Sequence, residues 1–320
     1  MNAHLFLRRV LQTIPTLFLI TVVSFVLLHV APGGPAQIML GDRSTPALVH
    51  QINHSLGLDK PLYQQYAIWL WQYLHGNFGY SYDYHQSVIS LIGQNLPHTL
   101  ILVITAIAFS HVLAIIVGSA QAYWRNSIGD HLTTAAIYFL YAMPTFWLGL
   151  VLVSIFAIRF GWLPSGGFSD TLSTTPSFGS ILTHLVLPGL TLLLVTVAGW
   201  SRYMRASMSR VLVEDYIRTA RSKGAAEWRV VGKHALKNAI LPLITLGGFS
   251  IPALFSGALI IEVIFNYPGM GLLFWNAANQ RDYPVLLGII VIVGLLTVLG
   301  NLLADLLYGW ADPRIKVQSG

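Results

Sequence analysis

The chain has 320 residues, of which 55% are apolar and only 9% are charged, with a formal net charge of +6. Soluble globular proteins carry roughly 25% charged residues, so this composition and the mean hydropathy of +0.64 predict an integral membrane protein. The scarcity of charge excludes disordered, collagen-like and coiled-coil proteins. The absence of cysteine excludes disulfides, thiolate metal sites and cysteine nucleophiles.

Six apolar stretches approach or exceed the roughly 20 residues that a helix needs to cross a bilayer. They lie at 10–30, 100–122, 132–158, 181–200, 239–261 and 285–308. The first is longer than the roughly 7–15-residue apolar region of a signal peptide and lacks a small-x-small cleavage pattern, so we expect it to be retained. The sequence therefore predicts an all-α integral membrane protein with six transmembrane helices.

The basic residues orient these six helices. With the N-terminus inside, 14 of the 18 Lys and Arg residues fall in inner segments, nine of them in 201–238, and four in outer segments. Positive charge accumulates on the cytoplasmic side of membrane proteins. We therefore expect both termini to be cytoplasmic and the chain to lie in the cytoplasmic, or inner, membrane.

The first outer segment contains a predicted amphipathic helix. Asp59 is placed to cap a helix that Pro61 opens and that ends before Gly76. Its apolar face is formed by Leu62, Tyr66, Trp69, Leu70, Tyr73 and Leu74. Such a face is typical of an interfacial helix with its aromatic rings at headgroup level, and a docking surface for an outside partner is the alternative.

Helix-breaking residues concentrate in the fourth and fifth stretches. Breakers are tolerated in membranes where neighbouring helices or a water-filled cavity satisfy the freed backbone groups, so these stretches are candidates for lining a pathway. Ordinary packing of membrane helices, which also favours Gly and Pro, is the alternative. The pathway or gate candidates are Pro188, Gly247, Gly248, Pro252 and Glu262. For Glu262, just past the fifth stretch, the alternative is an interfacial carboxylate facing water.

Enzyme motifs are missing from the sequence. There is no G-x-S-x-G elbow, no H-E-x-x-H and no pair of intramembrane aspartates, since Asp305 stands alone within the stretches. His50 and His54 have the spacing of half a metal site but lack further ligands, so we expect solvated histidines and predict neither a catalytic nor a metal site. None of the four lysines lies in a phosphate-binding loop, so a partner or a gradient must supply the energy for active transport.

The inner segment 201–238 predicts a compact helix-turn-helix. A helix beginning near Asp215 reaches a break at Gly224, and a second short helix follows. The glycine allows a sharp turn, and the small side chain of Ala220 allows close approach to a groove on another protein. Topological anchoring or binding of anionic lipid would explain the basic charge but not the spacing of Ala220 and Gly224.

This loop resembles the cytoplasmic coupling motif of ABC importer permeases, in the branch that serves dipeptides, oligopeptides and nickel. Gly224 takes the glycine position and Ala220 the second alanine of the general motif. The departures from that motif are Arg218, Thr219, His234 and Lys237. The form RTARSKG followed by HALKNA is nevertheless similar to what the peptide branch carries.

Further stretches extend the resemblance over nearly the whole chain. They read RRVLQTIPT from Arg8, LLHVAPGGP from Leu27, LGLDKP from Leu56, GNFGYS from Gly76, EVIFNYPGMG from Glu262 and RDYP from Arg281. Their order and spacing make the combination more specific than any one of them.

The resemblance implies a type I ABC importer permease fold. It divides the chain into an N-terminal transmembrane helix (1–31), an extracytoplasmic segment (32–95), a five-helix transport domain (96–309) with the coupling loop at 201–238, and a cytoplasmic tail (310–320). The implied partners are a sister permease, two cytoplasmic ATPase subunits and an extracytoplasmic solute-binding protein, within membrane lipid and without nucleic acid. ATP and Mg²⁺ would bind the ATPases, and no cofactor would bind this chain.

The implied function is translocation of di- or oligopeptides, driven by ATP that the partners hydrolyse. Nickel or another small solute is the alternative within the branch, and an intramembrane enzyme is a remoter one. The coupling residues implied by the resemblance are Arg218, Thr219, Ala220, Lys223, Gly224, Ala225 and Glu227.

Overall fold

The computed structural model describes residues 3–30, 40, 44–55, 57–170, 177–250 and 258–311. Regular structure in these residues is helical, apart from one isolated bridge between Tyr80 and Ser87, which confirms the all-α prediction. The helices are α1 (Ala3–Val30), α3 (Pro46–Ser55), α4 (Leu62–Leu74), α5 (Val88–Tyr123), α6 (Ile128–Ala142), α7 (Thr145–Leu152) with the π-helical η2 (Val153–Arg159), α8 (Phe178–Val211), α9 (Asp215–Ser222), α10 (Glu227–Arg229), η3 (Val230–Ala235), α11 (Leu236–Ala239), α12 (Leu241–Ser250), α14 (Leu259–Ile264), α15 (Met270–Gln280) and α16 (Tyr283–Ala311).

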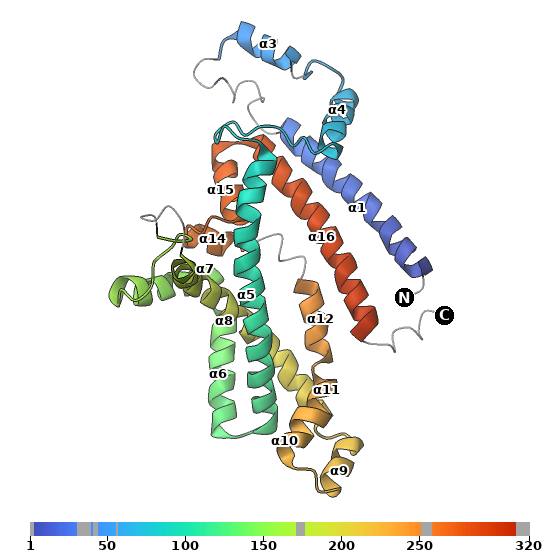
Figure 1. The fold of residues 1–320 in the computed structure, drawn as a ribbon, viewed down its shortest axis with the longest axis vertical. Helices are drawn as coiled ribbons and strands as arrows, with labels where there is room; N and C mark the ends of the chain where they lie inside the picture. The colour runs from blue at the N-terminus through green and yellow to red at the C-terminus, as the bar shows by residue number, and fades with distance from the viewer. Residues whose placement is uncertain are drawn as a thin grey trace.

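Among the long helices, α5 runs from one end of the molecule to the other, and the two ends are built differently (Figure 1). The helices α3, α4 and α15 lie toward one end, and α9, α10 and the turn between α5 and α6 lie at the other. The two ends can therefore take on separate tasks.

Three of the described helices are long and apolar enough to cross a membrane. They are Val88–Tyr123, Phe178–Val211 and Tyr283–Leu302, and a fourth span results if the bent pair Ile128–Ala142 and Thr145–Arg159 is counted as one. Thr13–Val26 within α1 is a shorter apolar helix. The predicted number of six is thus not reached within the described residues, which omit 251–257 of the fifth stretch.

The third predicted stretch is not one straight helix. Its two halves meet at an angle of 106°. Met143 has an extended backbone with φ −71° and ψ 133°, and Pro144 follows it. A proline lacks the N–H that a continuous helix requires and disfavours helical geometry at the residue before it, and at Met143 the backbone has left that geometry.

The core of the fold is the close contact between α5 and α8. Buried small side chains recur every fourth residue along α5. They are Ala106, Ser110, Ala114, Gly118 and Ala122. A Cβ atom on Gly118 would lie 2.6 Å from the Cβ of Met204 and from the carbonyl oxygen of Ser201, both on α8. Small residues let membrane helices approach until their backbones nearly touch.

The predicted amphipathic helix is α4, and its aromatic face packs on α1. Tyr66 and Trp69 lie 5.3 and 5.8 Å from the ring of Phe25, and the Tyr66 hydroxyl lies 2.9 Å from that of Thr21. This face therefore packs within the chain and is not wholly available to headgroups or a partner. Leu62 and Leu74, which the sequence placed on the same face, are exposed.

The predicted N-cap of α4 is wrong. The cap residue is Pro61, without a side-chain hydrogen bond. The Asp59 carboxylate instead lies 2.7 Å from Nδ1 of His54, and this hydrogen bond lowers the pKa of Asp59. The described residues contain no cluster of three His, Cys, Asp or Glu side chains fit for a metal ion.

The α5–α8 contact predicts a contrast between two glycines of one helix. Gly118→Ala should destabilise the protein by about 1–3 kcal/mol, because the added methyl group collides with backbone. Gly93→Ala should be neutral or stabilising by up to about 1 kcal/mol, because nothing lies within 4 Å of its Cβ position. Thermal unfolding of the purified protein in detergent measures both, and equal midpoints would contradict the packing role of Gly118.

Candidate functional site

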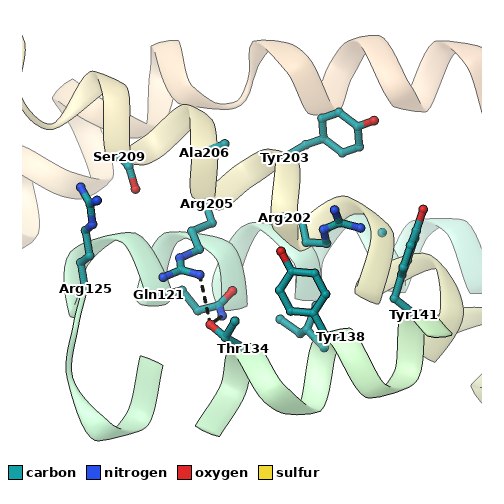
Figure 2. Close-up of a pocket in the computed structure, with 12 residues that line it drawn as sticks. Gln121, Arg125, Thr134, Tyr138, Tyr141, Arg202, Tyr203, Arg205, Ala206 and Ser209 are labelled. Carbon is teal, nitrogen blue, oxygen red and sulfur yellow. Dashed lines mark hydrogen bonds between the residues drawn. The ribbon is translucent and has the colours of Figure 1, made fainter. Parts of the chain in front are cut away.

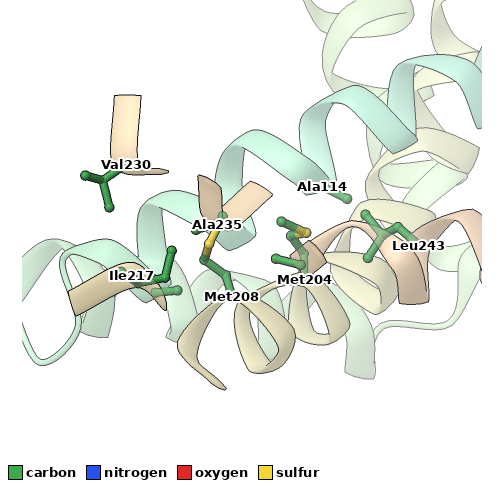
Figure 3. Packing of buried hydrophobic residues seen from close by; sticks show 9 residues of the cluster. Ala114, Met204, Met208, Ile217, Val230, Ala235 and Leu243 are labelled. Carbon is green, nitrogen blue, oxygen red and sulfur yellow. The ribbon is translucent and has the colours of Figure 1, made fainter. Parts of the chain in front are cut away.

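A buried cluster joins α9 to the long helices. The side chains of Ile217, Met204, Met208 and Leu243 are completely buried within it, and Figure 3 shows them converging from α9, α8 and α12. The Tyr216 hydroxyl also accepts a hydrogen bond of 2.8 Å from the Asn238 side chain on α11. The short helix α9 is therefore firmly attached to α8 and to the segment that leads into α12.

The turn after α9 is built around Gly224. Its φ of +76° is in the left-handed region that favours glycine. The Gly224 N–H donates to the carbonyl of Arg221 at 2.9 Å, and the Ala225 N–H to that of Ala220 at 3.2 Å. This pair of bonds is the Schellman motif, which satisfies the last carbonyls of a helix. The predicted helix, glycine break and second helix are confirmed.

The predicted coupling residues divide into two groups. Ala220 and Ala225 pack against the buried cluster, so they hold α9 in place. Arg218, Thr219, Lys223 and Gly224 are exposed, and open space surrounds the Cβ position of Gly224. The exposed group forms the solvent-accessible surface of α9 and its turn.

Glu227 follows the turn and is paired with Arg221, which precedes it. Its carboxylate accepts hydrogen bonds of 2.7 and 3.3 Å from the guanidinium of Arg221. These bonds lower the pKa of Glu227 and raise that of Arg221. Because both side chains are solvent-accessible, we regard the pair as fixing geometry more than adding stability.

Three residues of this site were not identified from the sequence. They are Arg221, Ile217 and Trp228. The apolar spacing of Ile217 and Ala220 on an otherwise polar helix could have predicted the buried face of α9. Trp228 is 72% exposed, and the guanidinium of Arg229 lies 5.1 Å from its ring centroid. The sequence feature that could have identified it is the presence of a single Trp in a basic loop.

The breakers Pro188 and Gly247 occupy packed positions. Pro188 is buried inside an uninterrupted α8. A Cβ atom on Gly247 would lie 2.6 Å from Nε2 of His111, whose ring packs 4.1 Å from that of Trp200. These contacts favour the alternative of helix packing at both residues. Gly248 lies in α12, and Pro252 lies outside the described residues.

An apolar pocket nevertheless lies between α5, α8 and the fifth stretch. Its volume is about 380 Å³. The lining residues are Val103, Ala106, Ile107, Leu192, Val195, Thr196, Gly199, Trp200, Ser250 and Ala258. The fourth and fifth stretches thus face a common space, although neither Pro188 nor Gly247 lines it.

Glu262 is buried, so the alternative of a carboxylate facing water is wrong. One oxygen accepts a hydrogen bond of 2.8 Å from the Thr99 hydroxyl on α5. The other accepts bonds of 2.6 and 3.2 Å from the N–H groups of Gly271 and Leu272 in the first turn of α15. Free N–H groups and the helix dipole favour a carboxylate at this position. Glu262 therefore clamps α14, α15 and α5 together.

A second carboxylate plays a similar part at the start of α16. Asp282 is buried and accepts hydrogen bonds from the Ser81 hydroxyl and, at 3.3 Å, from the Asp83 N–H. Burial, with the nearby Asp282 charge, raises the pKa of Tyr82 to about 12. The GNFGYS and RDYP stretches are therefore parts of one contact.

The Glu262 clamp predicts a specific effect of its threonine partner. Thr99→Val removes the hydroxyl that donates to Glu262 and accepts from the Met270 N–H at 2.8 Å, which should cost about 1–3 kcal/mol. Amides of Gly271 and Leu272 should then exchange hydrogen faster. The control is Thr105→Val in the same helix, whose hydroxyl bonds only to carbonyls of its own helix, as far as the described residues show. Equal exchange in both variants would contradict the clamp.

Known protein families and relatives match nearly the whole length of the chain. Residues 111–317 match the family described as binding-protein-dependent transport system inner membrane component, and residues 2–103 match the N-terminal region of such components. The chain is 41% identical over 311 residues to the oligopeptide transport system permease protein AppB of Bacillus subtilis, covering 97% of this chain and 98% of the relative. It is 37% identical over 329 residues to the di/tripeptide transport system permease protein DppB of Pseudomonas aeruginosa, with coverage of 97% and 98%.

Solved structures share the fold at low sequence identity. The MetNI methionine ABC transporter, in inward-facing conformations, matches with a TM-score of 0.51 and 15% identity over 68% of this chain and 97% of that chain. An amino acid ABC transporter crystallised with histidines matches with a TM-score of 0.50 and 16% identity over 69% and 94%.

Proposed function

Because the chain belongs to the family of binding-protein-dependent transport system inner membrane components, we propose that it carries di- and oligopeptides across the cytoplasmic membrane. It is a multi-pass membrane permease subunit of an ABC importer and not itself an enzyme. The observation that supports the peptide assignment is the full-length similarity to relatives named as oligopeptide and di/tripeptide permeases. No described site favours nickel, since His54 is paired with Asp59 outside any ligand cluster.

The family implies ATPase and solute-binding partners. We propose a finer assembly in which this chain pairs with a sister permease, two ATPases bind the inner face and one binding protein delivers peptide outside. ATP and Mg²⁺ would be held by the ATPases, which fits the lack of a phosphate-binding loop in this sequence.

The proposed contact with the ATPase is the exposed surface of α9 and its turn. Arg218, Thr219 and Lys223 supply polar and positive groups, and Gly224 keeps the tip bare. Since Ile217 belongs to the buried cluster that also holds Met204 and Met208 of α8 and Leu243 of α12, a push on α9 would be transmitted to the helices that face the apolar pocket. This attachment supports a mechanical role for the loop.

The proposed topology has six spans with both termini and segment 201–238 inside. The proposed divisions are 1–31, 32–95, 96–309 and 310–320. The charge distribution supports this arrangement, since 14 of the 18 basic residues fall on the inner side.

Gly224 tests the coupling proposal. The wild-type complex, reconstituted with its ATPases and binding protein, should take up labelled peptide with ATP and should not take up nickel. Gly224→Val should reduce uptake at least tenfold while ATP hydrolysis persists, because a β-branched residue strains a left-handed position and fills the open space. Gly224→Asn tolerates the left-handed backbone but still adds bulk, so impairment there would identify close approach as the requirement.

The matched control is Gly232→Val. Gly232 also has nothing within 4 Å of its Cβ position, but its φ is negative, so uptake should stay near wild type. Full uptake by both Gly224 variants would contradict the coupling role. Nickel uptake without peptide uptake in the wild type would overturn the solute assignment alone.

The natural lack of cysteine allows a clean test of topology. In spheroplasts, a membrane-impermeant maleimide should label Asn77→Cys directly and Ile128→Cys only after permeabilisation. Both positions are exposed, and they lie toward opposite ends of the fold in the α4–α5 connection and at the start of α6. The reverse labelling pattern would invert the proposed orientation.

A further inference from the structure

A pocket of about 590 Å³ lies between α6 and α8, next to the last turn of α5 (Figure 2). The lining includes three arginines and three tyrosines, namely Arg125, Arg202, Arg205, Tyr138, Tyr141 and Tyr203. The pocket lies apart from the α9 surface and shares only Gly199 with the lining of the apolar pocket described above. Its chemistry therefore calls for a separate explanation.

One of the three arginines has a structural partner. The Arg205 guanidinium forms an ion pair of 2.7 Å with Asp130 and donates a hydrogen bond of 3.1 Å to the Thr134 hydroxyl. The Asp130 carboxylate is buried and also accepts from the Asn126 N–H at 3.0 Å. This pair joins α8 to the start of α6 and leaves no net charge.

The other two arginines are not paired with a carboxylate among the described residues. The Arg202 guanidinium lies 5.0 Å from the ring centroid of Tyr138 and 4.6 Å from that of Tyr141. No acidic side chain in the described part of the chain forms an ion pair with Arg202 or Arg125. In Figure 2 Arg125 lies beyond Arg205, away from Arg202. The pocket thus has two unneutralised positive charges and several phenolic hydroxyl donors.

The surface beside the pocket is apolar. Phe139, which adjoins the pocket residue Tyr138 on α6, is 63% exposed, although α6 also supplies two tyrosines to the pocket. A soluble anion would use the charges but leave this surface uncovered. A molecule with an anionic head and a hydrocarbon tail would satisfy both, and the tyrosines suit the boundary between the two environments.

We propose that this pocket binds the headgroup of an anionic phospholipid of the inner leaflet. The phosphate would lie near Arg202 and accept hydrogen bonds from the neighbouring tyrosine hydroxyls, with attraction from Arg125. The acyl chains would run past Phe139 toward the centre of the bilayer. Placement in the inner leaflet rests on the topology proposed above, whereas the choice of an anionic lipid rests on the pocket itself. Basic pockets between membrane helices on the cytoplasmic side commonly bind such headgroups.

The experiment uses the complete transporter, purified in detergent, delipidated and titrated with phosphatidylglycerol, phosphatidylcholine or inorganic phosphate. Native mass spectrometry counts bound lipid, and thermal unfolding measures stabilisation. Wild type should retain phosphatidylglycerol over phosphatidylcholine. Arg202→Gln should weaken retention roughly fivefold, and Arg202→Gln with Arg125→Gln by the square of that factor. The matched control is Arg159→Gln, because Arg159 also lies over an aromatic ring, that of Phe160 at 5.9 Å, but outside the pocket.

A second variant distinguishes loss of lipid binding from misfolding of the protein. Tyr138→Phe with Tyr141→Phe keeps both rings beside Arg202 and removes only the hydroxyls, so it should fold normally and still lose part of the preference. Equal retention of phosphatidylglycerol by wild type and the arginine variants would overturn the proposal. Equal stabilisation by inorganic phosphate would also overturn it and would identify a soluble anion as the ligand. A third contrary result would be a wild type without lipid preference, combined with loss of the sister permease from the arginine variants.

Discussion

The close approach of α5 to α8 is the contact on which the rest of the structure depends. Hydrocarbon offers helices little reason to associate through apolar burial, so packing and interhelical hydrogen bonds must hold them together. Gly118 brings the backbone of α5 against α8, and the same row of small side chains passes Ala106 and Ala114. At its two ends this pair carries the Glu262 clamp, through Thr99, and the cluster that fixes α9, through Ala114.

The two ends use different chemistry for this attachment. At one end, carboxylates satisfy the free N–H groups at helix starts, as Glu262 does for α15 and Asp282 does near α16. At the other, Ile217 and two methionines fill an apolar cluster. Methionine adapts to irregular spaces more readily than branched residues. The clamped end is thus the more directional contact, and the α9 end has packing that tolerates small rearrangement.

Much of this arrangement follows from the sequence, because local signals determine it. The α4 helix and the Gly224 turn depend on residues within a few positions of one another. The bend at Pro144 was missed because hydropathy reports apolar length and not backbone continuity. The buried Glu262 is hydrogen-bonded to Thr99, 163 positions away, and the packing role of Gly118 depends on the backbone of another helix. Contacts between residues so far apart in the sequence cannot be predicted from local sequence signals.

The basic charge of the chain separates into distinct uses once its positions are known. Arg205 is neutralised by buried Asp130, and Arg221 is paired with Glu227, so neither is free to attract a partner strongly. Among the described residues, Arg218 is paired with the exposed Asp215 at 3.5 Å, which is a weak pair, and the exposed Lys223 precedes Gly224 at the turn. A loop that served only to anchor topology would need none of this division between braced and open cations. The division supports the proposed docking role, in which the paired groups would hold the shape of the surface and the open groups would contact the partner.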